Sequence, residues 1–217
     1  RDLNRVFPGS KTGSLASQLA FQFSTEIAPH VDYMIDFHTG GASRFNAAQV
    51  RIIKDHEELK DLATIFGAPF VLHSKNINKS FRNSCFQLNK PIVLFEGGKS
   101  FYVDNTISKI GIEGVKRLLA HFDMINPKFK VTPPKALPIF VEESKWIRAK
   151  HSGMFKSKVT INTKISVGDV VGQITDPFGK IYHEVKSKYD GYIINVNEAC
   201  LIYQGDALLH ITTKLKD

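Results

Sequence analysis

The sequence predicts an α/β layer fold followed by a small all-β domain. Up to about residue 125, apolar runs rich in branched and aromatic residues alternate with segments of helical periodicity. Beyond residue 138, short β-like runs are separated by glycines and show little helical periodicity. Residues 126–138 between them concentrate prolines and lysines. We therefore expect an α/β domain at 1–125, a linker at 126–138 and a β domain at 139–217.

Three segments of the first domain predict helices. In residues 13–30, apolar side chains recur at four-residue spacing, with Ser14 as a cap and Pro29 as a stop. Residues 55–67 begin with a capping-box pattern, Asp and then Glu three positions later, and end in glycine. Residues 106–122 show the same helical periodicity. Helices of this kind are expected to pack on a sheet.

The strands of this sheet end in polar residues. "VDYMIDFH" (31–38) and "KPIVLFE" (90–96) resemble strands buried on both faces, yet they finish on His38 and Glu96 and glycines follow each. Ligands of open α/β sheets bind beyond the carboxyl ends of strands, so we expect both side chains at one site. Asp36 points to the same side as His38 and is expected to hold the ring nitrogen that does not bind metal.

These residues also have plain structural alternatives. A lone histidine is more often a satisfied surface or core group, and Glu96 can cap the next helix or pair with Lys99. In "RDLNRVFPG" at the start of the sequence, Arg1, Asn4 and Arg5 cluster beside a Phe-Pro-Gly turn. Arginine forks suit bidentate capture of a carboxylate, although arginines in a loop are often only solvated.

The motifs "RDLNRVFPG", "DFHTGG" and "FEGGKS", in this order and at these separations, resemble the succinylglutamate desuccinylase/aspartoacylase family. This family is the zinc-dependent amidohydrolase branch of the carboxypeptidase A-like fold. The resemblance covers most of residues 1–125. It implies a mixed central sheet flanked by helices, as in zinc carboxypeptidases.

The resemblance also implies residue roles. His38 would bind Zn²⁺, Glu96 would be the catalytic base, and Asn4 and Arg5 would bind the substrate carboxylate. Arg82, in the looser motif "KSFRNSC", matches the family's second carboxylate-binding arginine. The implied reaction is hydrolysis of the amide bond of an N-acyl amino acid by metal-activated water.

One part of the family pattern is missing from the sequence. The family takes its first two zinc ligands from an upstream H-x-x-E pair, and catalytic zinc needs three protein ligands. Because the sequence starts in mid-motif without methionine, we expect the N-terminal part to be missing and the other two ligands to lie upstream of residue 1. A metal-free relative is the alternative. The remaining histidines show no paired ligand spacing and are interpreted as structural: His30, His56, His73, His121, His151, His183 and His210.

The C-terminal segment contains an internal sequence repeat. "GDVVGQIT" at 168–175 and "GDALLHIT" at 205–212 share glycine, acid, apolar pair and Ile-Thr ending, which is typical of two halves of a small barrel or sandwich. This segment resembles the β domain of bacterial family members and a biotinyl/lipoyl-like barrel-sandwich. No lysine sits between hydrophobic partners at the expected hairpin tip, so a carrier role is not expected. Tyr203 lies near a position from which some members reach the active site, but a half-buried sheet tyrosine is the preferred interpretation.

The amino-acid composition limits the classes of binding partner and the cellular location to be expected. The net charge is +8, but the lysines are scattered along the chain, so we do not expect nucleic-acid binding. We expect the positive charge to attract small carboxylate substrates instead. Apolar stretches fall far short of the ~20 residues of a membrane span. Cys85 and Cys200 form neither a metal motif nor a disulfide framework, which favours the cytoplasm. Homo-oligomerisation is left open.

The resemblance therefore implies a zinc-dependent deacylase of N-acyl amino acids. Two alternatives stay open: a metallocarboxypeptidase acting on peptides, and a catalytically inactive binding module. The accepted acyl group and amino acid depend on loops that the sequence does not place.

Overall fold

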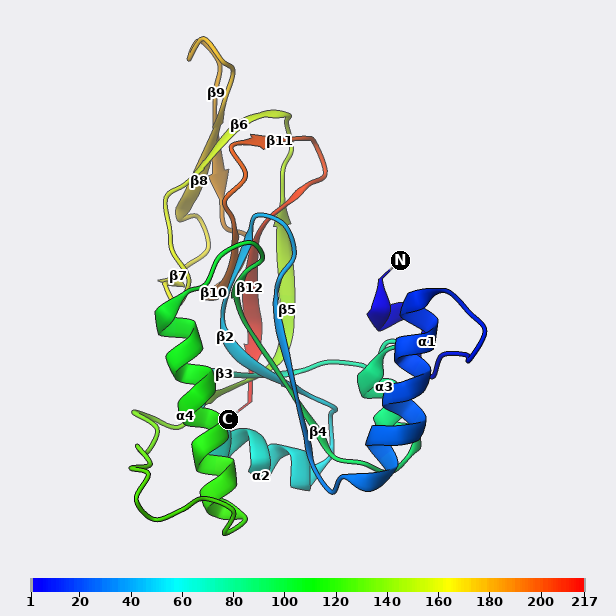
Figure 1. Cartoon of the computed structure of the whole chain (residues 1–217). Helices are drawn as coiled ribbons and strands as arrows, with labels where there is room; N and C mark the ends of the chain where they lie inside the picture. Colours follow the sequence, from blue (N-terminus) through cyan, green and yellow to red (C-terminus); the bar gives the residue numbers. More distant parts are fainter. Residues whose placement is uncertain (1, 217) are drawn as a thin grey trace.

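A mixed sheet of eight strands runs through the computed structural model, which describes residues 2–216. Figure 1 shows the arrangement, and the strand order is β1-β4-β2-β3-β5-β12-β10-β7. In chain order the strands are β1 (Met34–Gly40), β2 (Arg44–Ile52), β3 (Phe70–His73), β4 (Ile92–Lys99), β5 (Ile139–Arg148), β7 (Lys164–Ile165), β10 (Gly191–Asn197) and β12 (Ala207–Leu215).

The sheet combines parallel and antiparallel neighbours. β1 pairs parallel with β4, β4 pairs antiparallel with β2, and β2 pairs parallel with β3. The predicted strands 31–38 and 90–96 are β1 and β4, so the expected mixed α/β sheet is confirmed. The sequence patterns did not predict β2 and β3, because polar residues interrupt the first and the second has only four residues. The closer likeness to zinc carboxypeptidases and a missing N-terminal part stay predictions.

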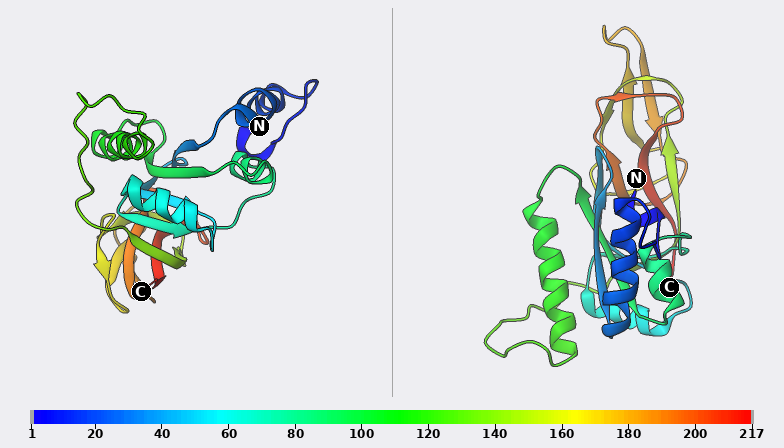
Figure 2. Two further views of the ribbon diagram at one scale, coloured as in Figure 1. Left: turned by 90° about the horizontal axis from the view of Figure 1, so that it is seen from below. Right: turned by 45° about the vertical axis from the view of Figure 1, so that its right-hand side comes forward.

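Helices cover both faces of this sheet near β1 and β4 (Figure 2). α2 and α4 pack on each other and on β2 and β4. α3 packs on the opposite face, where the Cys85 sulfur lies 3.7 Å from the Met34 sulfur of β1. α1 continues through a π-turn and a 3₁₀ turn to His30, as the predicted helix 13–30 requires. The helices are α1 (Leu15–Gln22), α2 (Glu57–Phe66), α3 (Phe81–Gln87) and α4 (Asn105–His121).

The start of α2 differs from the predicted capping box. Its N-cap is His56, whose Nδ1 accepts a hydrogen bond from the Leu59 N–H at 3.4 Å. Asp55 lies one residue too early and has a left-handed backbone (φ 59°), so the capping-box prediction for Asp55 and Glu58 is wrong. The helix does end at Gly67, which has the left-handed backbone that glycine favours (φ 71°).

Five strands of the sheet close into a barrel. β2, β3, β5, β12 and β10 are joined in that order, and β10 returns to pair antiparallel with β2. β2 and β3 precede the loop 126–138, whereas β5, β10 and β12 follow it. That loop contains no helix or strand, but strands on its two sides are hydrogen-bonded into one sheet. The predicted domain boundaries stay predictions about the sequence.

A second sheet lies beyond the barrel. Its strand order is β11-β6-β8-β9, and the β8–β9 hairpin extends to the far end of the molecule (Figure 1). The two sequence repeats form β8 and β12, which lie in different sheets and bury apolar side chains in one core. This arrangement is in keeping with a barrel-sandwich. The strands are β6 (Gly153–Ser157), β8 (Val170–Thr175), β9 (Tyr182–Lys186) and β11 (Leu201–Ile202).

The close contact between α2 and α4 depends on a glycine, which has no side chain. A Cβ atom at Gly114 of α4 would lie 2.5 Å from the ring carbons of Phe66, which is fully buried. We expect Gly114→Ala to lower the free energy of unfolding by ~1–3 kcal/mol, as overpacking does. This cost exceeds the ~0.5–1 kcal/mol that alanine gains over glycine in a helix. Urea denaturation measures the difference.

The matched control is Gly111→Ala, one turn earlier in α4. Its Cβ would lie 3.1 Å from the ring of Phe37, a residue that is 53% exposed and can therefore shift more easily than the buried Phe66. The control is therefore expected to lose less stability than Gly114→Ala, or to gain some. Equal losses at both positions would contradict the packing explanation.

Within residues 2–216, no helix has the length and apolar character needed to cross a bilayer.

Candidate active site

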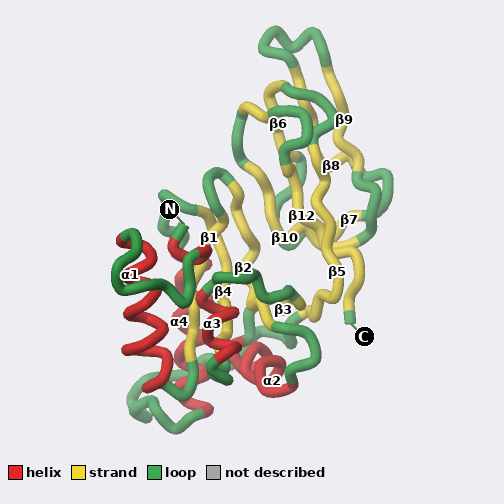
Figure 3. Tube along the Cα trace, turned by 90° about the vertical axis from the view of Figure 1, so that its right-hand side faces the viewer, coloured by secondary structure: helices red, strands yellow, loops and turns green. Residues whose placement is uncertain are grey.

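His38 and Glu96 are direct register partners in the adjacent parallel strands β1 and β4. Side chains of register partners leave a sheet on the same face. The flanking rings of Phe37 and Phe95 contact each other at 5.5 Å on the α4 side, so His38 and Glu96 face the opposite side. Figure 3 shows the two strands side by side. The imidazole and the carboxylate are thus brought together at one strand end.

The imidazole of His38 is oriented by Asp36, as the two-residue spacing predicts. Its Nε2 lies 2.8 Å from Asp36 Oδ2. This hydrogen bond, together with the charges of Asp36 and Glu96, raises the pKa of His38 above its ordinary value, although burial and Arg51 oppose the shift. Among the described residues, no group hydrogen-bonds Nδ1 of His38. The ring therefore presents one nitrogen to the space beside Glu96.

Each carboxylate oxygen of Glu96 has a polar side chain as its partner. Oε1 accepts a hydrogen bond from Asn46 Nδ2 at 2.9 Å, and Oε2 lies 2.7 Å from Nε of Arg51. The Glu96 side chain is only 14% exposed. The two alternatives for this residue are wrong in the structure, since Lys99 pairs instead with Glu198 at 2.6 Å. The helix that follows is capped by another residue, Asp104.

Arg82 is buried on the same side as this pair. Its Nη1 donates to Ser74 Oγ and its Nη2 to the Lys75 carbonyl, both at 2.8 Å. Burial, with a smaller contribution from the charge of Arg51, lowers the pKa of Arg82 to about 10. The carboxylates of Asp36 and Glu96 oppose this shift. The structure thus places Arg82 within electrostatic reach of the predicted catalytic base.

Asn4 and Arg5 lie in the short 3₁₀ turn η1 (Leu3–Arg5) beside α3. Asn4 Oδ1 accepts a hydrogen bond at 2.7 Å from the backbone N–H of Phe81, the residue before Arg82. The guanidinium of Arg5 is half exposed and donates at 2.7 Å to the Asn4 carbonyl. The structure therefore joins Asn4 to the helix that carries Arg82. It leaves Arg5 at the surface, and the substrate-binding roles stay predictions.

The structure adds three residues that the sequence did not single out: Asn46, Arg51 and Asn195. Asn195 Nδ2 donates to Asn46 Oδ1 at 2.5 Å, and Asn46 in turn donates to Glu96. A signal for Arg51 was present, since a charged residue between Val50 and Ile52 is unusual in a strand. Asn195 had no comparable signal, because only the pairing of β10 with β2 brings it near the site.

The described residues fit one position of a zinc site and do not complete it. Within 2–216, no group of three or more His, Cys, Asp or Glu side chains is arranged to hold a metal ion. His38 has the required features of a single ligand, with one nitrogen held by a carboxylate and the other available. Catalytic zinc sites use three protein ligands.

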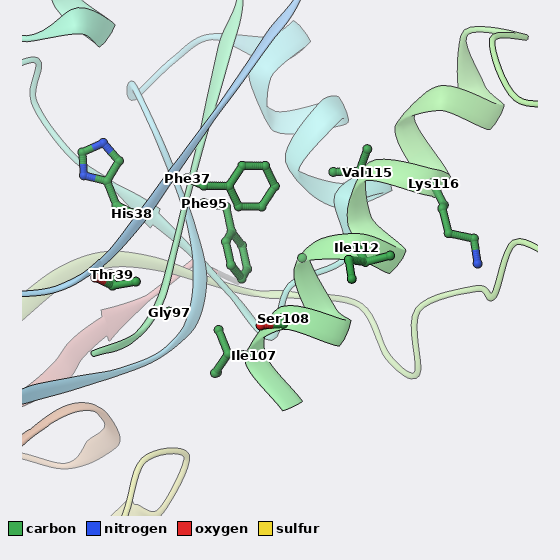
Figure 4. A pocket seen from close by; sticks show the side chains of 11 residues that line it. Phe37, His38, Thr39, Phe95, Gly97, Ile107, Ser108, Ile112, Val115 and Lys116 are labelled. Carbon is green, nitrogen blue, oxygen red and sulfur yellow. The ribbon is translucent and has the colours of Figure 1, made fainter. Parts of the chain in front are cut away.

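A separate hollow of about 450 Å³ lies between the sheet and α4. Its walls are mainly apolar and include Phe37, Phe95, Ile107 and Ile112. Figure 4 shows the His38 ring pointing away from these side chains. His38 borders the hollow, but its ring points away from it, and Glu96 is not among the lining residues.

The remaining histidines and Tyr203 lie elsewhere. His56 caps α2, and His210 stacks on Trp146 at 4.3 Å. His151 stacks on His183 at 3.8 Å in the second sheet. Tyr203 is 72% exposed, so the interpretation as a half-buried sheet tyrosine is wrong; it follows β11 in a surface turn.

Comparison with known proteins gives consistent matches. The family model "Succinylglutamate desuccinylase/Aspartoacylase catalytic domain" matches residues 1–122. An N-alpha-acetyl-L-2,4-diaminobutyric acid deacetylase from Halomonas elongata is 23% identical over 220 residues, which cover 95% of this chain and 64% of that protein. The chain thus spans less than two thirds of the length of this relative.

Solved structures match the fold over almost the whole chain. The product-bound ectoine utilization protein EutE (DoeB) from Ruegeria pomeroyi has a TM-score of 0.86 at 19% identity, covering 99% of this chain and 68% of that one. A succinylglutamate desuccinylase/aspartoacylase structure from Rhodobacter sphaeroides has a TM-score of 0.85 at 22% identity, covering 100% and 69%. The high TM-scores show that the fold is shared, and at identities this low the matches show the fold alone.

Proposed function

We propose that this chain, which belongs to the succinylglutamate desuccinylase/aspartoacylase family, carries the catalytic base and one metal ligand of a zinc-dependent hydrolase of N-acyl amino acids. The observation that carries the proposal is the register pairing of His38 with Glu96 on one face of the sheet. A carboxylate base and a metal-binding imidazole must share a space to act on the same water. The products are a carboxylic acid and a free amino acid.

We propose that zinc binds His38 through Nδ1, because Asp36 holds Nε2. The two other ligands are expected upstream of residue 1. When bound, zinc supplies a Lewis acid that polarises the acyl carbonyl and makes a coordinated water more acidic. Asp36 fixes the ring orientation and increases the basicity of the imidazole, as carboxylate partners of zinc ligands do.

Glu96 acts as the general base and then as the general acid. It accepts the proton of the attacking water and delivers it to the nitrogen of the departing amine. Asn46 and Arg51 hold its two oxygens, so that the carboxylate does not rotate out of reach between the two transfers. Fixed geometry of this kind contributes to catalysis because a misplaced base loses much of its rate advantage.

We assign the substrate carboxylate to the region where η1 lies beside α3. Arg82 is buried there, and Asn4 is hydrogen-bonded to the first residue of α3. Arg5 lies next to Asn4 and keeps an exposed guanidinium. These groups suit an α-carboxylate, for which arginine is the preferred partner.

A substrate panel tests the proposal. The natural full-length protein, purified with zinc, is assayed by amine release from Nα-acetyl-L-2,4-diaminobutyric acid, N-succinylglutamate and N-acetylaspartate. The first compound is included because the relative from Halomonas elongata is named as its deacetylase. We expect turnover of at least one member that disappears with a zinc chelator and returns with zinc. Parallel assays use dipeptides with a free amino terminus.

Each other outcome favours a different function. Hydrolysis of the dipeptides with none of N-acyl amino acids would favour a metallocarboxypeptidase. No hydrolysis in either panel by zinc-loaded protein would favour an inactive binding module. The cytoplasmic location and the absence of nucleic-acid partners stay predictions from the sequence, and the oligomeric state stays open.

A further inference from the structure

A chain of buried amides connects the C-terminal strands to Glu96. Asn195 on β10 and Asn46 on β2 are register partners in the strand pair that closes the barrel. Asn195 Nδ2 donates to Asn46 Oδ1 at 2.5 Å, and Asn46 Nδ2 donates to Glu96 Oε1 at 2.9 Å. Both asparagines are almost inaccessible to solvent, at 2% and 4% exposure. Water therefore does not compete for these two hydrogen bonds.

The chemistry of Glu96 determines the direction of every donor in this chain. An ionised carboxylate only accepts hydrogen bonds, so Asn46 must present its NH₂ group to Glu96. The carbonyl oxygen of Asn46 then faces β10 and requires a donor there. Asn195 supplies that donor, whereas a flipped Asn195 amide would place two carbonyl oxygens against each other. Asn195 thus supplies the donor that this orientation of Asn46 requires and stabilises it.

The arrangement leaves one polar atom without a partner. Oδ1 of Asn195 is buried, and the described part of the chain offers it no hydrogen bond. A residue chosen only for packing at this position would be apolar, because an unpaired buried carbonyl costs free energy. The presence of an amide here therefore indicates that the hydrogen bond donated to Asn46 is what the site requires.

We propose that Asn195 is a positioning residue for the catalytic base. Through Asn46 it holds one oxygen of Glu96 by a hydrogen bond, while the other oxygen forms an ion pair with Arg51. The proposal rests on the proposed function of Glu96. It assigns the C-terminal strands a part in the chemical step, although Asn195 does not touch the substrate.

Asn197, two residues further along the same strand, provides a matched control. It is also buried, at 8% exposure, and its Nδ2 donates to the Ala207 carbonyl at 2.9 Å. Its Oδ1 accepts from the Ala199 N–H, so its amide serves the local backbone and not Asn46. Replacing Asn197 removes a buried amide from β10 without interrupting the path to Glu96.

The kinetic test compares Asn195→Leu with Asn197→Leu in the full-length protein, with the preferred substrate of the panel. We expect Asn195→Leu to lower kcat about tenfold with KM within about twofold, because the base acts in the chemical step. Asn197→Leu is expected to keep kcat within about twofold, even where its melting temperature falls equally. Equal kcat losses in both variants, or none in Asn195→Leu, would overturn the proposal.

A double-mutant cycle separates positioning from a general structural effect. If Asn195 acts through Asn46, then adding Asn195→Leu to Asn46→Ala lowers kcat no further. Multiplicative losses of kcat in the double variant would show that Asn195 acts by another route. Asn46→Ala alone is expected to lower kcat at least as much as Asn195→Leu, since it removes the direct donor.

An NMR measurement tests the amide chain without any turnover. The side-chain NH₂ protons of Asn46 are expected to exchange slowly with solvent in the unsubstituted protein and at least tenfold faster in Asn195→Leu, but not in Asn197→Leu. Unchanged exchange in Asn195→Leu would overturn the proposal even in an active enzyme. If the substrate panel fails while the exchange result holds, the amide chain stands and only the assigned reaction is lost.

Discussion

Replacement of Glu96 by glutamine is expected to lower kcat by at least a hundredfold on the preferred N-acyl amino acid. Removal of a general base typically costs ~10²–10⁴ in rate, because an amide accepts no proton from water at neutral pH. Glutamine has nearly the same shape as glutamate and keeps an oxygen for the hydrogen bond from Asn46. The fold and zinc binding should therefore survive, which thermal unfolding and metal analysis would show alongside steady-state kinetics.

Loss of an ion pair has to be distinguished from loss of the base. Glu198 is the appropriate comparison, since its carboxylate pairs with Lys99 at 2.6 Å near the end of β4 and has no assigned role in the reaction. Glu198→Gln is expected to keep kcat within about twofold, because exposed ion pairs contribute little. Normal turnover by Glu96→Gln would refute the general-base assignment, whatever the behaviour of Glu198→Gln.

Substitution of His38 by alanine is expected to abolish zinc binding and, with it, measurable turnover. A catalytic zinc has three protein ligands, and two remaining ligands bind the ion far more weakly. The affinity loss should exceed the ~10–100-fold that follows from removal of a ligand's hydrogen-bond partner. Equilibrium dialysis against zinc, with metal quantified by mass spectrometry, measures this directly and requires no substrate.

Two further variants define the scale of this loss. Asp36→Asn removes only the carboxylate that holds His38 Nε2, so its zinc affinity should fall between the unsubstituted protein and His38→Ala. His121→Ala removes an exposed histidine at the end of α4 and should leave zinc binding unchanged. Full zinc occupancy in His38→Ala would refute the assignment of His38 as a ligand.

The amino-acid sequence by itself determined the elements nearest to the site. The apolar runs of β1 and β4 are local patterns, and the polar residues that end them mark the strand ends without reference to any other part of the chain. The relation between Asp36 and His38 also follows locally, because side chains two apart on a strand share a face. Helical periodicity is also a local pattern, so the helices of residues 13–30, 55–67 and 106–122 were predictable as helices. Only the start of the second was predicted wrongly.

Only the tertiary structure decided what surrounds Glu96. Asn195 and Asn46 are 149 residues apart in the chain, and they meet because β10 closes the barrel against β2. No periodicity in a sequence specifies which strands become neighbours over such a separation. The register between β2 and β4 also shifts between Asn46 and Gln49, and a shift of this kind changes which residues face the site. The partners of Glu96 are therefore a product of strand pairing, whereas the residue itself is a product of its own strand.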